Sequence, residues 1–406
     1  MFKHVDAYAG DPILTLNEAF GKDPRPHKIN LSIGIYFDDA GKLPVMRAVR
    51  QSETAMLQHI GPRAYQPMEG AANYRSAVQQ LLFGANHEAV LSKRIATVQT
   101  IGGSGGLKVG GDFLKRYFPD ANVWISDPTW DNHRAMFEGA GFAVNTYPYY
   151  NPANGALNFA GMLQAFKGEG RDGHSSGIPQ GSIVLVHACC HNPTGVDLTA
   201  AQWNELIPVI KARGLIPYLD IAYQGFGDGI DEDTFALQLL TQAGVSFFCA
   251  SSFSKSFSLY GERCGALSVV CPDAAQAELV LGQMRATVRR NYSSPPTHGG
   301  QIVARVLQTP ALYAQWADEL NDMRERINLM RQRLFDVLQQ KLPGKDFSYF
   351  LTQRGMFSYT GLSAEQVDQL REVHAVYLVR SGRMCVAGLN SGNVEATAVA
   401  MAAVLA

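Results

Sequence analysis

The sequence lacks the features that mark several large classes of protein. None of its six cysteines belongs to a Cys-x-x-Cys pair, and no apolar run approaches the ~20 residues that cross a bilayer. Neither sign of charge is in excess, because 35 basic residues face 36 acidic ones and the formal net charge is −1. We therefore expect no metal site, no membrane association and no nucleic-acid partner.

The composition is that of a globular protein. Hydrophobic residues make up 46% and charged residues 17% of the 406 positions, which is far from the composition of disordered chains. A chain of this length predicts two or three domains. The first residues, Met1 to Asp6, contain no apolar signal segment, and the cysteines fall in apolar runs typical of buried, reduced thiols. We expect a soluble, cytoplasmic protein.

Residues 46–310 alternate between amphipathic segments and short apolar runs. The amphipathic segments include 131–141 and 199–213, the latter with Thr199 as N-cap and Gly214 as its stop. The strand-like runs cover 94–101, 122–126, 182–190, 216–221, 246–251 and 264–271. This alternation predicts an α/β fold with a mainly parallel central sheet sandwiched by helices.

The rest of the chain has a different pattern. One long helix is expected over 310–341 and further helices over 363–374 and from Asn393 onward. Strands are expected at 347–351 and 356–359, and a hairpin at 375–387. We therefore expect a large domain over 46–310 and a smaller α+β domain formed by 1–45 with 311–406.

Chemically distinctive residues follow several of the apolar runs, at the sheet edge where parallel α/β folds bind ligands. The glycine-rich segment 102–106 contains Ser104 and precedes a helix expected to start near Leu107. Such a turn suits a phosphate cradle or a tightly packed corner equally well. An NAD-dependent dehydrogenase is excluded because Lys108 stands where the dinucleotide loop requires its third glycine.

Two ionisable residues also follow strand-like runs. A carboxylate at Asp220 is costly to bury without a cation or donors, although a helix N-cap is the alternative. Lys255 lies among serines and phenylalanines after 246–250. Partial desolvation of such a lysine lowers the pKa of its ammonium group and frees an amine that attacks carbonyls to form a Schiff base. A lone lysine without these surroundings would be solvated.

Further candidates have ordinary structural alternatives. Asn192 belongs to a His-Asn-Pro-Thr-Gly turn, and Trp130 follows Pro128 and Thr129 in a place that also suits a core aromatic. Arg383 is an isolated cation in an apolar run and favours a bidentate carboxylate partner. Arg289 belongs to an Arg-Arg pair that a solvated helix end explains as well as a function does.

Taken together, these segments resemble the class I pyridoxal-phosphate aminotransferases. The resemblance covers nearly the whole chain and is carried by Ser252-Phe253-Ser254-Lys255 with Arg263, by 191–195 and by 220–226. Within the family, 31–34, 66–70 and 288–292 are more similar to the bacterial aromatic-amino-acid enzymes than to strict aspartate enzymes. The family has a type I fold of pyridoxal-phosphate-dependent transferases, which agrees with the layout expected above.

The resemblance implies a set of cofactor contacts. Lys255 would form the Schiff base with pyridoxal 5'-phosphate, Asp220 would pair with the pyridine nitrogen, and His133 would support Asp220. Asn192 and Tyr223 would bond the ring oxygen while Trp130 stacks on the ring. The phosphate would be held by Ser104, Gly105, Ser252, Ser254, Arg263 and, from a neighbouring subunit, Tyr65. That contribution implies a homodimer with active sites at the subunit interface.

The resemblance also implies the substrates. Arg383 would bind the α-carboxylate with Asn192 and Trp130 beside it and Gly34 closing over it, and Arg289 of the other subunit would bind a distal carboxylate. The expected reaction moves the amino group of aromatic (Tyr, Phe, Trp) and dicarboxylic (Asp, Glu) amino acids to 2-oxo acids such as 2-oxoglutarate by a ping-pong mechanism. The alternatives are a strict aspartate aminotransferase and, more remotely, a non-catalytic effector-binding module.

Overall fold

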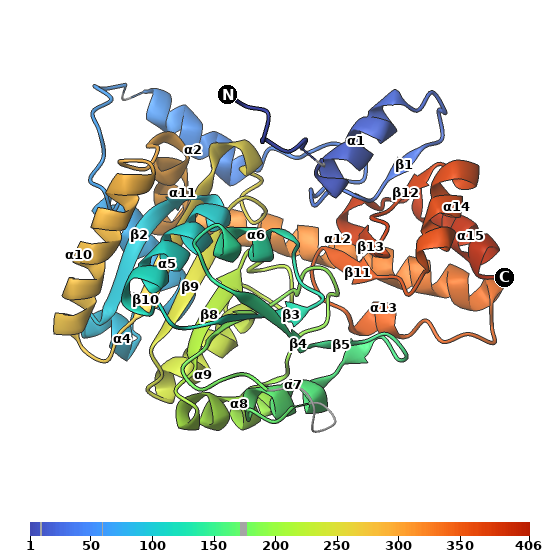
Figure 1. Ribbon diagram of the computed structural model, residues 1–406. Helices are drawn as coiled ribbons and strands as arrows, with labels where there is room; N and C mark the ends of the chain where they lie inside the picture. Colours follow the sequence, from blue (N-terminus) through green and yellow to red (C-terminus); the bar gives the residue numbers. More distant parts are fainter. Residues whose placement is uncertain (9, 59, 171–176) are drawn as a thin grey trace.

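A seven-stranded sheet forms the centre of the computed structural model, which describes residues 1–8, 10–58, 60–170 and 177–406 (Figure 1). Its strands lie in the order β2-β10-β9-β8-β7-β3-β4. All neighbours pair in parallel except β10, which is antiparallel to both β2 and β9. The bounds are β2 (Ile95–Ile101), β3 (Val123–Asp127), β4 (Val144–Pro148), β7 (Ile183–His187), β8 (Ile216–Ile221), β9 (Phe247–Ser252) and β10 (Cys264–Val270).

Helices cover both faces of this sheet and bury a separate apolar core on each. On one face, side chains such as Phe113, Phe137 and Met284 pack on the sheet from α5 (Gly102–Tyr117), α6 (Asn132–Glu138) and α10 (Ala274–Asn291). On the other face lie α3 (Ala72–Phe83), α7 (Phe159–Phe166), α8 (Ala200–Ala212), α9 (Phe235–Gln242) and α11 (His298–Gln308). The expected sandwich of a mainly parallel sheet between helices is confirmed.

The N-terminal and C-terminal segments pack together beside the sheet (Figure 1). The long helix α12 (Pro310–Lys341) contacts α2 (Arg47–Leu57) and α11 at the sheet side and α13 (Tyr349–Thr352) and α15 (Val394–Leu405) at the other. Two small sheets complete this region, β1 (Ile29–Asn30) with β12 (Val376–Tyr377), and β11 (Phe357–Tyr359) with β13 (Arg383–Cys385). The remaining elements are α1 (Pro12–Lys22), α4 (Glu88–Leu91), β5 (Tyr150–Asn151), β6 (Ala156–Leu157) and α14 (Ala364–His374).

Local sequence signals place several helix ends where they were expected. Thr199 and Gln202 form a capping box at the start of α8, and Gly214, just beyond its end, has a φ of 55°. Ser363 and Gln366 form the same box before α14. Within the described residues, no helix combines the length and the apolar character that crossing a membrane requires.

Two expectations for the C-terminal region are wrong. The segment 347–351 is not a strand, because Tyr349–Thr352 forms the short helix α13. The segment 375–387 is not a hairpin, because β12 pairs in parallel with β1 and β13 pairs with β11. Both errors involve very short elements whose pairing is decided by partners far away in the sequence.

The glycine-rich segment 102–106 is not a turn before a helix, as the sequence suggested, but the first turns of α5 itself. The absence of side chains lets this helix lie directly on the sheet. A Cβ at Gly103 would come within 3.1 Å of the Ser252 side chain, and one at Gly106 would lie 3.0 Å from the Ala266 carbonyl oxygen. The segment is therefore a tightly packed corner, and it also presents a helix N-terminus to the sheet edge.

Candidate active site

A cavity of about 150 Å³ lies at the carboxyl ends of the parallel strands. Residues from five strand ends meet there, as expected for a ligand site of an open α/β sheet. Nine of the site residues expected from the sequence line it: Ser104, Trp130, Asn192, Asp220, Tyr223, Ser252, Ser254, Lys255 and Arg263. Gly105 follows Ser104 in the first turns of α5.

Asp220 is a buried carboxylate with one oxygen held and the other free. Its Oδ2 lies 3.0 Å from Nε2 of His133, whose Nδ1 is 2.8 Å from the Thr129 hydroxyl. Oδ1 is buried with no hydrogen-bond partner among the described residues. Burial raises the pKa of Asp220, but the His133 hydrogen bond and the nearby positive charges outweigh it and lower the pKa overall. Asp220 is thus an ionised carboxylate that offers one oxygen to the cavity.

Lys255 faces the same cavity and is prepared as a nucleophile. Burial lowers the pKa of its amine to about 8, against the opposing effect of Asp220. Its Nζ lies 4.9 Å from the centre of the Tyr223 ring. The Tyr223 hydroxyl accepts a hydrogen bond from Nδ2 of Asn192 at 3.4 Å, and burial raises the pKa of this phenol.

Hydroxyl and guanidinium groups converge near the start of α5. Arg263 donates to the Ser254 hydroxyl at 3.2 Å, and the Ser252 hydroxyl lies 3.3 Å from that of Ser254. A Cβ at Gly102 would lie 2.5 Å from the Arg263 guanidinium, so this cation lies directly against the first residue of α5. A helix N-terminus, a cation and several hydroxyl groups together form a cradle for an anion such as a phosphate.

Arg383 borders a second, adjoining cavity that shares Trp130 and Asn192 with the first. This guanidinium is 5% exposed and donates to the Ser32 carbonyl at 2.6 Å and to Oδ1 of Asn192 at 3.4 Å. Its Nε is buried without a partner, and no carboxylate pairs with it in the described part of the chain. Burial lowers its pKa. A buried cation without a protein counter-ion is suited to bind a carboxylate from a ligand.

Arg383 packs on a residue that in turn contacts the N-terminal part of the chain. The Phe357 ring lies 4.6 Å below the Arg383 guanidinium. Gly34 packs so closely on that ring that a Cβ at this position would lie 2.9 Å from it. Gly34 therefore contacts the ring on which Arg383 packs, and its expected role at a substrate carboxylate stays a prediction.

Two expected residues do not reach either cavity within one subunit. Tyr65 is 95% exposed on an extended segment. Arg289 is exposed in the last turn of α10 and donates to the Ser293 hydroxyl. Neither side chain lines a cavity of its own chain, and the expected contribution of both to a second subunit stays a prediction.

Sequence analysis missed other residues at the site. His187 lines the first cavity at the end of β7, with its ring centroid 5.1 Å from that of His133. Burial lowers the pKa of His187 to about 3, so it is neutral at physiological pH. The signal available in the sequence was that His187 is a polar residue directly after the apolar run 183–186. Asp197 was missed too, although its carboxylate accepts from the backbone N–H groups of Cys190 and His191 at 2.7 and 2.8 Å and so holds the turn that carries Asn192.

The groups around the first cavity fit pyridoxal 5'-phosphate. The cradle at the start of α5 suits its phosphate, and the buried Lys255 amine suits its aldehyde. The free Oδ1 of Asp220 is an acceptor that a protonated pyridine nitrogen would satisfy. Among the described residues, two buried clusters each bring three potential metal ligands together. One consists of His133, His187 and Asp220, and the other of Cys189, Cys190 and Asp233. The hydrogen bond with Cys190 and burial raise the pKa of the Cys189 thiol, and burial raises the pKa of the Cys190 thiol, so the thiolate forms of both are disfavoured. His133 already contacts the Asp220 carboxylate.

Comparison with known proteins agrees with this geometry. Residues 26–401 match the model of the family described as aminotransferase class I and II. The chain is 56% identical over 406 residues to the aromatic-amino-acid aminotransferase of Escherichia coli strain K12 and 50% identical over 405 residues to an aspartate aminotransferase of Pseudomonas aeruginosa, with 100% of each chain covered. A crystal structure of an aromatic-amino-acid aminotransferase from Burkholderia pseudomallei, covalently bound to pyridoxal phosphate, is 50% identical, with a TM-score of 0.96 and full coverage of both chains. The chain belongs to the class I and II aminotransferases.

Proposed function

We propose that this protein is a pyridoxal 5'-phosphate-dependent aminotransferase that accepts aromatic and dicarboxylic amino acids and uses 2-oxo acids such as 2-oxoglutarate as acceptors. The observation that carries the proposal is that a buried Lys255 amine and an Asp220 carboxylate with one unpartnered oxygen line the same cavity. Bound pyridoxal phosphate supplies an aldehyde that condenses with amines and a ring that withdraws electrons from the substrate Cα.

The residues of the chain divide the remaining work. Lys255 binds the aldehyde, and as a free amine it takes the proton from the substrate Cα and returns it on the other side of the transferred nitrogen. Asp220 keeps the pyridine nitrogen protonated, and His133 fixes its orientation from the far side. Asn192 and Tyr223 would hydrogen-bond the ring oxygen, and Trp130 would cover the ring face. Gly105, at the start of α5, would hold the phosphate together with Ser104, Ser252, Ser254 and Arg263.

The substrate carboxylate is bound by Arg383. Its two terminal nitrogens already have protein acceptors, but Nε is unpartnered and the carboxylate oxygens are stronger acceptors than the neutral Asn192 oxygen. Gly34 closes over this site. Because every amino acid carries the α-carboxylate, Arg383 serves all substrates alike, and discrimination among them depends on what meets the side chain.

Arg289, contributed by the second subunit, meets the distal carboxylate of a dicarboxylic substrate. An aromatic side chain in the same place would leave this cation unpaired, which is costly if the cation stays buried. We propose that Arg289 turns toward solvent when an aromatic substrate binds. The exposed Arg289 and its hydrogen bond to Ser293 support an outward position that is available to it.

Steady-state kinetics across Asp, Glu, Tyr, Phe and Trp test this proposal, with 2-oxoglutarate as acceptor and Arg289→Leu as the variant. We expect kcat/KM for aspartate to fall about 100-fold or more in the variant, while kcat/KM for phenylalanine changes less than about threefold. A wild-type enzyme that uses aspartate but not phenylalanine would identify the second candidate, a strict aspartate aminotransferase, which the 50% identity to the Pseudomonas aeruginosa enzyme favours. A protein that binds no pyridoxal phosphate would overturn both.

We also propose that the enzyme is a homodimer in which Tyr65 of one subunit contacts the cofactor phosphate of the other. Eleven of the nineteen large apolar side chains exposed in the described residues fall between Met1 and Met68. Four of them, Leu57, Ile60, Tyr65 and Met68, fall within twelve residues of one another, and exposed apolar side chains that lie together on a surface favour an interaction with a partner. The largest exposed fractions near Tyr65 itself, 73% for Ile60 and 68% for Leu57, support a second copy as the partner.

Two further proposals concern the domains and the location of the protein. We propose that residues 46–310 form the cofactor-binding domain and that 1–45 with 311–406 form a smaller domain that closes over the substrate. The contact of Gly34 with Phe357 inside the smaller unit, and the hydrogen bond of Arg383 to Asn192 at the sheet edge, support this division. We propose a cytoplasmic location, which the six buried and unpaired cysteines support.

A further inference from the structure

A buried arginine outside both cavities has no counter-ion. Arg331 lies in α12 and is 2% exposed. It forms no ion pair within the described residues, and its Nε is without a partner. Its terminal nitrogens donate to the Phe350 carbonyl at 3.3 Å, the Gly355 carbonyl at 2.8 Å, the Phe357 carbonyl at 2.7 Å and the Ser358 hydroxyl.

Three of the four acceptors of Arg331, those of Gly355, Phe357 and Ser358, belong to the segment that supports Arg383. Between the Gly355 and Ser358 acceptors lies Phe357, whose ring contacts the Arg383 guanidinium at 4.6 Å. The same ring meets the Tyr223 ring edge to face, with centroids 5.7 Å apart. Tyr359, two residues on, is the register partner of Arg383 in the β11–β13 pair. Arg331 thus holds the backbone on which Arg383 rests.

The opposite side of this segment is fixed against the sheet. The Arg354 N–H donates to the Gly195 carbonyl at 2.6 Å, and its guanidinium pairs with Asp228 at 2.8 Å. A Cβ at Gly355 would come within 2.5 Å of the Cys190 Cβ. The segment 353–358 therefore packs between α12 on one side and two loops on the other. These loops follow β7 and β8 and carry Asn192 and Tyr223.

The geometry of the guanidinium explains why an arginine occupies this core position. Its planar fork reaches four acceptors at once, which the single nitrogen of a lysine does not. An apolar residue would fill the space without the cost of burying a charge but would leave these backbone oxygens without donors. The arginine therefore fixes the position of segment 353–358, in addition to any contribution to stability.

We propose that Arg331 is a positioning residue for the substrate carboxylate, acting through Phe357 on Arg383. This inference rests on the proposed function, because it assigns the carboxylate site to amino-acid and oxo-acid substrates. It predicts that loss of Arg331 weakens the binding of all carboxylate ligands by a common factor, since they share Arg383.

The experiment compares the pyridoxal-phosphate-loaded wild type with Arg331→Met, Arg331→Lys and Ser358→Ala. Dissociation constants are measured for succinate and for 3-phenylpropionate, and kcat and KM for aspartate and phenylalanine. Leu334→Ala is the matched control, because it removes a fully buried side chain from the same helix but takes away no hydrogen-bond donor to segment 353–358. Arg289→Leu is the second control and is expected to weaken succinate only.

We expect Arg331→Met to raise both dissociation constants and both KM values about 10-fold, with kcat changed less than about threefold. Arg331→Lys should not restore binding, and Ser358→Ala should raise the dissociation constants about twofold.

The inference is overturned if a folded Arg331→Met or Ser358→Ala binds both acids like the wild type. It is also overturned if Arg331→Lys restores binding or if Leu334→Ala weakens it equally. If Arg331→Met does not fold, Arg331→Lys and Ser358→Ala decide. An inactive wild type would instead refute the proposed function.

Discussion

Burial acts on Lys255 and Asp220 in ways that suit their different tasks. It lowers the pKa of the Lys255 amine to about 8, because the charged form loses solvation. For Asp220 the same penalty is outweighed by His133 and the neighbouring positive charges, so this carboxylate stays ionised. One cavity therefore holds a partly neutral amine beside a permanent anion, which is the combination that attack on an aldehyde and protonation of a pyridine require.

The lowered pKa of Lys255 has a measurable consequence. Only the neutral amine attacks an aldehyde, so the rate at which the apoenzyme takes up pyridoxal phosphate should rise about tenfold per pH unit below pH 7 and level off above pH 8. The measurement is stopped-flow absorbance of the cofactor between pH 6 and 9. A rate still rising steeply at pH 9 would show an ordinary lysine.

Lys255→Ala is the control for that measurement. It should bind the cofactor through the phosphate cradle without the rise in rate between pH 6 and 8, and it should lose transamination by about three orders of magnitude or more. Borohydride should attach the cofactor permanently to the wild type but not to the variant.

Residues at or just beyond the ends of strands were predictable from the sequence, whereas residues that act through the backbone were not. Asp220 and Lys255 follow apolar runs, and the sheet edge brings them together. Asp197 and Arg331 reveal nothing by their neighbours in sequence, because their partners are backbone groups whose positions only the folded chain fixes.

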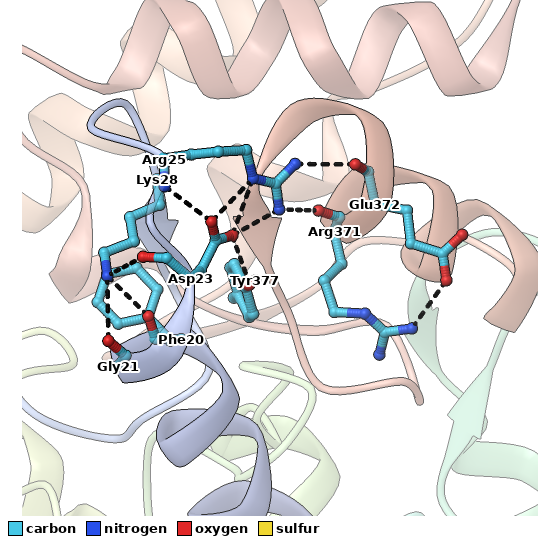
Figure 2. A network of polar contacts seen from close by, with 8 residues as sticks. All are labelled: Phe20, Gly21, Asp23, Arg25, Lys28, Arg371, Glu372 and Tyr377. Carbon is cyan, nitrogen blue, oxygen red and sulfur yellow. Dashed lines mark hydrogen bonds and ion pairs between the residues drawn. The ribbon is translucent and has the colours of Figure 1, made fainter.

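At the scale of elements, a polar network joins the N-terminal segment to the C-terminal helices (Figure 2). Asp23, just after α1, accepts from the Arg25 guanidinium at 2.5 Å and from the Tyr377 hydroxyl of β12 at 2.7 Å. Arg25 also donates to the carbonyls of Arg371 and Glu372 near the end of α14, each at 2.8 Å. Lys28 donates to the Phe20 and Asp23 carbonyls at the end of α1. The network holds three elements together beside the β1–β12 pair.

Replacing Asp23 should therefore destabilise the fold in a pH-dependent manner. The hydrogen bonds from Arg25 and Tyr377 lower the pKa of Asp23 in the folded protein. Its contribution is present above the unfolded pKa of about 4 and is lost as the pH falls toward the folded value. Asp23→Asn should lower the melting temperature by about 2 °C at pH 7, with a smaller difference from wild type at pH 4.

Thermal denaturation of both proteins at pH 7, 5 and 4 measures this effect. Glu365→Gln is the matched control, because that side chain is 81% exposed and lies 3.9 Å from Arg380, so it should change stability little. A difference between wild type and Asp23→Asn that grows toward acid pH would contradict the expected sign.

Long elements with clear caps were predictable, and short ones were not. Helix α12 has the expected bounds, and the capping boxes before α8 and α14 were visible as Thr199 and Ser363 with glutamine three residues on. The two residues of β12 lie against Ile29 and Asn30, and no local pattern predicts a partner at that separation. The antiparallel direction of β10 was equally hidden, since an apolar run has no direction.

For the whole molecule, the dimer proposal makes a quantitative prediction. Lys255→Ala subunits lack the catalytic amine, and Arg289→Leu subunits lack the distal cation. If Arg289 acts across the interface, a mixed dimer contains one site with Lys255 from one subunit and Arg289 from the other. Random mixing should then restore about a quarter of the wild-type sites for aspartate, because half of the dimers are mixed and each has one complete site.

The subunits are mixed by denaturing and refolding them together, and aspartate turnover is measured against each variant refolded alone. Size-exclusion chromatography with light scattering gives the mass of the assembly. A protein that stays monomeric, or a mixture no more active than the sum of its parts, would contradict the contribution of Arg289 in trans.

The reversed direction of β10 has a consequence for how the enzyme tolerates change in length. Since β10 begins at the edge where β9 ends, the short connection 253–263 delivers Lys255 at one end and Arg263 at the other to the same cavity. Insertion or deletion of one residue in this connection would shift amine and guanidinium relative to each other. Connections at the far edge of the sheet, such as the one at Gly244, carry no such constraint, so tolerance to natural and engineered indels should differ sharply between the two edges.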